Sequence, residues 1–172
     1  MTDITLGYSD SEDRVWLASS DGHRFWLTRR LLSRLLDALA GLLTRTVPGG
    51  DLPNALPADQ RIHLEHAESL ARSPEGQPAL LLNKAGLASP SGVTPTPPRL
   101  ATRITCQADG PRGALIVEAA GVATRFELNR IDFHRLLAAM ATVANQAHWD
   151  LPDLPAWLDP TSVDTETRAD GA

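Results

Sequence analysis

Three arginines in this sequence could bind an anion because of where they stand. Arg29 and Arg130 each fall in the first turn of a predicted helix, and Arg30 follows Arg29 directly. Free backbone N–H groups and the helix dipole favour an anion at that end of a helix and disfavour a cation. These arginines therefore predict a site for a small phosphate- or carboxylate-containing ligand. Alternatively, each arginine pairs with a nearby acid, such as Asp21 or Glu127, or lies along the sheet.

Two histidines could contribute to a metal site. His63 and His66 lie at i and i+3 of a predicted helix, and glutamates lie between and beside them. The order His-Leu-Glu-His is not the His-Glu-x-x-His pattern of zinc proteases, and an exposed helix face of mixed charge explains the spacing equally well. Cys106 is the only cysteine. It excludes an internal disulfide, and its place in a predicted strand is typical of a small core residue. We therefore predict no metal site and no cofactor.

Nucleophilic catalysis has no recognisable motif in this chain. The sequence contains no Gly-x-Ser-x-Gly elbow and no glycine-rich loop that could hold a phosphate. No catalytic residue is predicted. The sequence leaves open whether the protein is an enzyme, and it favours a protein that is not one.

The C-terminal segment carries large apolar residues among acids and prolines. These residues are Trp149, Leu151, Leu154 and Trp157. Such a segment can dock in an apolar groove of a partner, with the aromatic rings as anchors. We therefore name them as candidate partner-binding residues, although they could instead fold back onto the protein's own sheet. Residues 159–172 are predicted to be a disordered acidic tail.

The net charge of −5 lies entirely at the C-terminal end. Residues 149–172 hold six acids and one base, whereas residues 1–148 hold fifteen of each. A neutral body argues against nucleic-acid binding, which usually needs a basic surface. No apolar run reaches the roughly 18–20 residues of a membrane helix, and the N-terminus lacks the features of a secretory signal. We therefore expect a cytoplasmic protein without membrane contact. The arginine-rich composition, with Lys84 as the only lysine, indicates a GC-rich bacterial genome.

Hydrophobic periodicity predicts the elements that position these residues. Alternating apolar residues predict a short strand over 4–8, and short apolar runs predict two more over 15–17 and 25–27. Thr28 is a suitable N-cap, and leucines at helical spacing predict a helix that ends near Thr44. The middle of the chain predicts a helix over 58–72, a strand over 79–82 and a mobile proline-rich loop over 86–99.

The opening pattern then returns. Strands are predicted over 104–106, 115–117 and 122–128, and Asn129 can cap a helix that extends to Ala147. At an offset of 101 residues, eight of sixteen positions from Arg24 to Leu39 are identical to their counterparts. The sequence therefore predicts an internally duplicated β-β-(β)-α unit.

The predicted fold class is α+β, with one domain over residues 1–158. The two copies span about 3–44 and 101–147, and antiparallel sheet packs against helices about a pseudo-twofold axis. The leading functional hypothesis is a non-enzymatic protein-interaction or assembly module of a bacterial cytoplasmic system, with a protein partner or self-association. The alternative is a protein or enzyme that binds a small anionic ligand through Arg29, Arg30 and Arg130.

Overall fold

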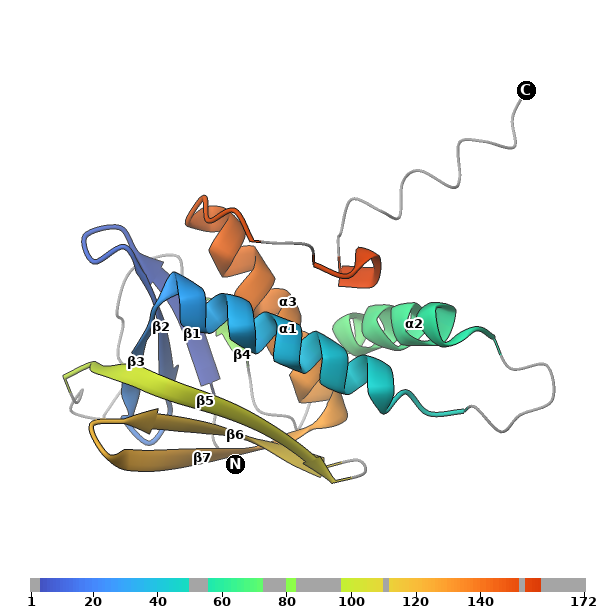
Figure 1. Ribbon diagram of the computed structural model, residues 1–172, viewed down its shortest axis with the longest axis horizontal. Helices are drawn as coiled ribbons and strands as arrows, with labels where there is room; N and C mark the ends of the chain where they lie inside the picture. The colour runs from blue at the N-terminus through green and yellow to red at the C-terminus, as the bar shows by residue number, and fades with distance from the viewer. Residues whose placement is uncertain are drawn as a thin grey trace.

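The computed structural model describes residues 4–49, 56–72, 80–82, 97–109, 112–151 and 154–158. It has an α+β fold, which confirms the predicted class (Figure 1). In chain order the elements are β1 (Ile4–Ser9), β2 (Arg14–Ser19), β3 (Arg24–Leu27), α1 (Arg29–Arg45), α2 (Ala58–Ala71), β4 (Leu80–Leu82), β5 (Arg99–Asp109), β6 (Arg112–Ala119), β7 (Val122–Asn129), α3 (Arg130–Gln146) and the short 3-10 helix η1 (Ala156–Leu158). The predicted tail over 159–172 and most of the predicted loop over 86–99 lie outside the described residues.

The seven strands form one mixed sheet in the order β4-β1-β2-β3-β5-β6-β7. Strands β1, β2 and β3 are antiparallel, as are β5, β6 and β7, but β4 is parallel to β1 and β5 is parallel to β3. The predicted antiparallel sheet is thus corrected to a mixed one. Parallel neighbours need a crossover connection, and the chain between β3 and β5 supplies one that contains α1 and α2.

The predicted pseudo-twofold axis is not confirmed. Each of the two units has three antiparallel strands followed by a helix of 17 residues. Strand β3 of the first unit pairs with β5 of the second, so a twofold axis would require β7 to pair with β1 in the same way. Within the described ranges, β1 pairs with β2 and β4, whereas β7 pairs with β6.

Both long helices begin at the capping residues that the sequence indicates. The Thr28 hydroxyl accepts a hydrogen bond from the Leu31 backbone N–H at 3.2 Å. The Asn129 side chain accepts from the Asp132 N–H at 2.9 Å, and the Asp132 carboxylate accepts from the Asn129 N–H at 3.0 Å. This second arrangement is a capping box, in which each residue satisfies a backbone donor that the helix leaves free.

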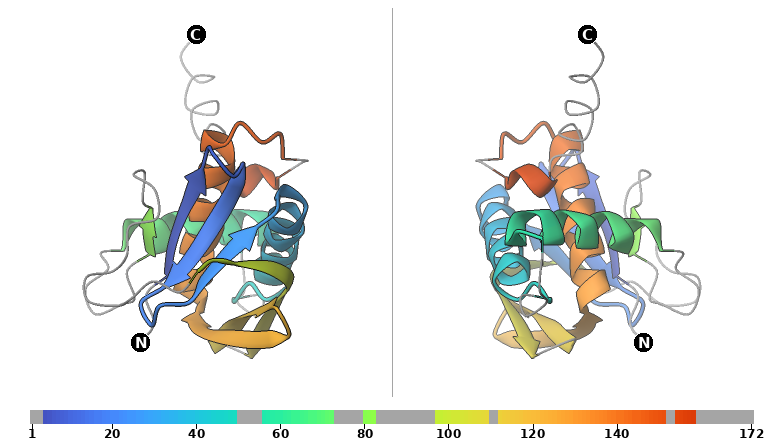
Figure 2. Two further views of the ribbon diagram at one scale, coloured as in Figure 1. Left: turned by 90° about the vertical axis from the view of Figure 1, so that its left-hand side faces the viewer. Right: turned by 90° about the vertical axis from the view of Figure 1, so that its right-hand side faces the viewer.

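The two capped helices lie in the angle between the β1–β3 and β5–β7 parts of the sheet (Figure 1). Their apolar faces and the inner face of the sheet form the buried core. Helix α2 packs on α3 and α1, on the side that faces away from β1–β3 (Figure 2). The helices therefore form two layers over the sheet, and α2 is the outer one.

Of the helices in the described ranges, none has the length and apolar character that crossing a membrane requires.

Candidate functional site

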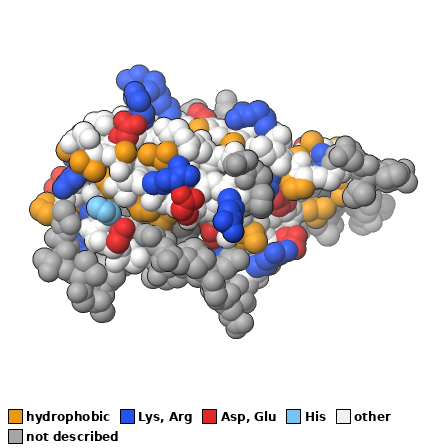
Figure 3. Space-filling model, turned by 90° about the horizontal axis from the view of Figure 1, so that it is seen from below, with side chains coloured by type: hydrophobic (Ala, Val, Ile, Leu, Met, Phe, Trp, Pro, Cys, Tyr) orange, Lys and Arg blue, Asp and Glu red, His pale blue; other side chains and the backbone are white. Residues whose placement is uncertain are grey.

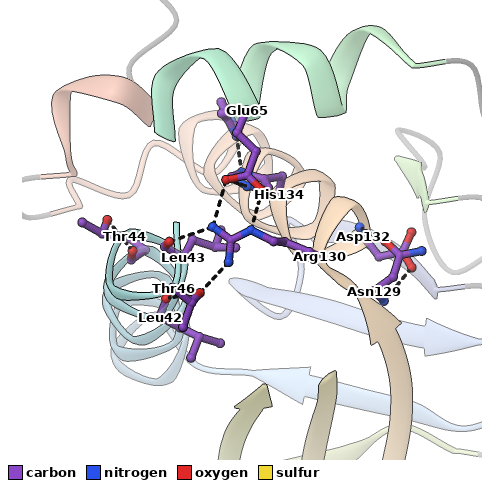
Figure 4. Close-up of polar contacts among 11 residues, drawn as sticks. Leu42, Leu43, Thr44, Thr46, Glu65, Asn129, Arg130, Asp132 and His134 are labelled. Atoms are coloured by element: carbon purple, nitrogen blue, oxygen red, sulfur yellow. Dashed lines mark hydrogen bonds and ion pairs between the residues drawn. The ribbon is translucent and has the colours of Figure 1, made fainter. Parts of the chain in front are cut away.

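Arg130 joins the three helices. It is the first residue of α3, and its guanidinium donates to both carboxylate oxygens of Glu65 on α2, with Nη2 and Oε2 2.9 Å apart (Figure 4). It also donates to the Leu43 carbonyl at 2.8 Å and to the Thr46 hydroxyl, at the C-terminal end of α1. The cation therefore lies at the favourable end of α1's dipole and in a paired, charge-assisted contact, which offsets its position at the start of α3.

Arg29 makes the corresponding contact at the other end of the helix pair. Its Nη2 donates at 2.6 Å to the carbonyl of Asp150, shortly after the end of α3. Helices α1 and α3 therefore run antiparallel, and the two arginines lie roughly 25 Å apart, the length of a 17-residue helix. Arg30, next to Arg29, is exposed. The structure thus does not bring Arg29, Arg30 and Arg130 together.

Two buried histidines face each other beside the Arg130–Glu65 pair. His66 of α2 and His134 of α3 have their Nδ1 atoms 3.1 Å apart, and the exposed fraction of His134 is 0%. Trp157 of η1 packs edge-on against both rings, with centroid distances of 5.3 Å to His66 and 6.2 Å to His134. The sequence did not predict this cluster because the two histidines are 68 residues apart.

Burial keeps both histidines uncharged at neutral pH. It lowers the pKa of His134 to about 4, and the Glu65 carboxylate opposes that shift while His66 and Arg130 add to it. Burial also lowers the pKa of His66, and His63 contributes to the same direction. Because neutral imidazoles carry one N–H each, one of the facing Nδ1 atoms donates and the other accepts.

The Glu65 carboxylate favours one of the two assignments of donor and acceptor. Its Oε2 lies 3.6 Å from Nε2 of His134, too far for a direct hydrogen bond but close enough for its charge to favour a proton on that nitrogen. His134 Nδ1 is then the acceptor and His66 Nδ1 the donor. In this assignment Nε2 of His66 carries a lone pair and no proton.

His66 lines a cavity between α2, α3 and η1 that has a volume of about 340 Å³. Trp157, Leu70 and Leu158 form apolar walls, and small side chains of α3, including Ala138 and Ala141, leave the space open. A second, more open hollow of about 680 Å³ shares His63 and Trp157 with the first and is also lined by Leu56, Asp59 and Leu64.

Helix α2 has apolar residues on its outer face as well as its inner one. Ile62, His66 and Ser69 are buried, whereas Leu64 is 57% exposed and Leu70 48% exposed. Leu56, just before the helix, is 45% exposed. We call the group of Leu56, Leu64, Leu70 and Trp157, with the hollows beside them, the α2 surface. The sequence predicted the helix, but it did not separate its inner from its outer apolar residues.

We compared the chain with family models, with curated proteins and with solved structures. None of them matches.

The four apolar residues predicted to bind a partner lie against the protein's own core. Trp149 is 6% exposed, and its Nε1 donates to the Asp13 carboxylate at 3.1 Å. Its ring packs edge-on against Tyr8 at a centroid distance of 6.0 Å. Leu151, Leu154 and Trp157 are partly buried and pack against the core. Trp157 alone among the four also lines the two hollows.

The described part of the structure shows no nucleophile at Cys106, no metal-binding group and, on the face drawn in Figure 3, no charged patch. Burial raises the pKa of the Cys106 thiol to about 12, so it is a poor nucleophile. In the part of the chain that the structure describes, no three histidine, cysteine or acidic residues are placed to hold a metal ion. On the face shown in Figure 3, basic and acidic side chains are interspersed, and neither sign forms a continuous patch.

Proposed function

We propose that this protein is a non-enzymatic interaction or assembly module that binds its partner, or a second copy, through the α2 surface. The observation that carries the proposal is the exposure of three leucines on and beside one helix, next to two open hollows that these leucines and Trp157 line together with polar side chains. The other two large apolar residues that are exposed within the described ranges, Leu100 and Val122, lie apart from it on β5 and β7. Gathered exposed apolar residues are typical of protein-binding surfaces.

The packing beneath the α2 surface supports this role. Arg130 and the histidine pair hold α2 against the end of α1 and against α3. The exposed leucines therefore lie on a helix that is already fixed in place, and few side chains of this protein need to become ordered when a partner binds. A preorganised surface of this kind gains affinity because less conformational entropy is lost on binding.

We further propose that the two β-β-β-α units arose by duplication, and that the module works in the bacterial cytoplasm. The identities at an offset of 101 residues and the equal helix lengths support the first statement. The paired contacts of Arg29 and Arg130, each with the end of the other long helix, also support it. The arginine-rich composition supports a bacterial source.

The test compares two double variants of the full chain. In Leu64→Glu with Leu70→Glu, charges replace apolar residues of the α2 surface; in Leu100→Glu with Val122→Glu, the same change is made at exposed positions elsewhere. Self-association is measured by sedimentation, and partners are identified by cross-linking in an extract of the source cells followed by mass spectrometry. We expect the first variant to lose the association and the second to keep it. If both variants behave like the wild type, the proposal is wrong.

A further inference from the structure

The buried polar side chain in the lining of the 340 Å³ cavity is that of His66, whereas the other polar lining residues, His63, Thr142 and Asn145, are partly or fully exposed. Nδ1 of His66 is directed at His134, so Nε2, on the opposite side of the ring, is the nitrogen available to the cavity that His66 lines. The chain of contacts from Arg130 through Glu65 and His134 leaves that nitrogen as a hydrogen-bond acceptor. A group that fills the cavity must offer it a donor, because an acceptor that loses water and gains no partner destabilises the complex.

The walls of the cavity restrict the rest of the occupant. Trp157 provides an aromatic surface and Leu70 an aliphatic one, while Ala138 leaves room for a ring. Aromatic rings pack favourably edge to face, as Trp157 already does with the histidines. A carboxylate has no proton to donate, and the apolar walls disfavour an ammonium group. A phenyl ring fits but leaves Nε2 unpaired.

We infer that this cavity takes a tyrosine side chain of the partner, whose hydroxyl donates a hydrogen bond to Nε2 of His66. The inference rests on the proposed function, and it adds the chemical identity of the partner's anchor. A phenol combines a flat apolar body with a single strong donor at its tip. Buried tyrosines of this kind often dominate the affinity of an interface.

The first experiment titrates the full chain with p-cresol, toluene and 3-methylindole, which stand for the side chains of tyrosine, phenylalanine and tryptophan. Binding is followed by NMR of the ¹⁵N-labelled histidine rings, which also reports the tautomer of His66. We expect p-cresol to bind about five to ten times more tightly than toluene, the ratio that one hydrogen bond between neutral groups gives. Equal or tighter binding of toluene or 3-methylindole, or a proton on His66 Nε2 in the free protein, would overturn the inference.

Variants then locate the binding. Ala138→Leu fills the cavity without removing a histidine, and Ala38→Leu makes the same change at an exposed position of α1. We expect p-cresol binding to fall at least tenfold in the first variant and to be unchanged in the second. His66→Phe should equalise the affinities for p-cresol and toluene. If Ala138→Leu binds p-cresol like the wild type, the cavity is not the site.

The two proposals can fail separately. Leu64 borders the neighbouring hollow and not this cavity, so Leu64→Glu should leave p-cresol binding intact while it weakens partner binding. If p-cresol binds but Leu64→Glu with Leu70→Glu keeps the partner, the proposed docking function is wrong and the phenol site stands. If p-cresol does not bind but the leucine variants lose the partner, the tyrosine inference is wrong and the docking function stands.

Discussion

Acidification from pH 7 to pH 5 should destabilise this fold, chiefly through His134. This histidine is fully buried, and burial lowers its pKa from 6.5 to about 4. Since the pKa in the folded state lies below that in the unfolded state, the unfolded state binds more protons at any pH below about 6.5. Stability is therefore full above pH 6.5 and is lost progressively as the pH falls towards 4.

The size of the effect follows from the two pKa values. Their difference of about 2.5 units corresponds to roughly 3 kcal/mol when the whole range is crossed. Between pH 7 and pH 5 the part that is lost is about 2 kcal/mol. The pKa of His66 is lowered too, so its titration adds to the loss in the same direction. Buried Asp132, whose pKa is raised from 3.8, shifts stability the opposite way at the acidic end of the range.

The assay is urea unfolding at pH 7, 6 and 5 in wild type and two variants. His134→Gln removes the buried imidazole and should flatten the pH dependence, whatever its effect on stability at pH 7. His148→Asn changes an exposed histidine whose backbone has a positive φ of 53°, a conformation that asparagine tolerates, so the wild-type dependence should remain. A wild-type stability that changes by less than about 0.5 kcal/mol between pH 7 and 5, well below the expected 2 kcal/mol, would refute the reasoning.

Two further substitutions test the packing around the site. Arg130→Met should lower the free energy of unfolding by about 3 kcal/mol, because it leaves the half-buried Glu65 carboxylate without its cation. Arg125→Met removes an exposed ion pair and should lower the free energy of unfolding by less than about 1 kcal/mol. Equal losses in urea unfolding would contradict this account. Gly113→Ala should destabilise the fold by about 2 kcal/mol, since the added methyl group meets the Phe133 ring. Gly41→Ala, in the middle of α1 and beside the flexible Arg45 side chain, should stabilise the fold by up to about 1 kcal/mol. Melting temperatures that move the same way in both glycine variants would show that these close contacts do not control stability.

The helices of this protein could be predicted because their signals are local. The Thr28 and Asn129 caps lie within three residues of the groups they satisfy, and the leucines of α1 recur at helical spacing. The pairing of β3 with β5 could not be predicted, since it joins residues near 25 to residues near 99. Strand neighbours of that kind depend on how the intervening helices fold back, and no short pattern encodes this.

The sequence singled out some residues of the candidate site but not the residues that they contact. Arg130 stood out as a cation at an unfavourable helix terminus, and in the structure it contacts Glu65 and the end of α1. His66 stood out through its spacing from His63, yet its contact is His134 on another helix. Each of these partners is more than 60 residues away in the sequence. A cation at an unfavourable helix terminus can be recognised from the sequence, but the residues that pair with it can be identified only from the tertiary structure.

The short seam between β3 and β5 has a consequence for how the chain folds. Among the described residues, two pairs, Phe25 with Arg99 and Trp26 with Leu100, join β3 to β5. Strands β1–β3 and β5–β7 each form a meander of sequence neighbours that closes short loops, whereas the seam, like the pairing of β4 with β1, closes a loop of more than 70 residues, which costs more chain entropy. The meanders should therefore form early, and the docking of α1 on α3 should commit the chain to its topology late. The rate of folding should follow the helix interface and depend little on the seam.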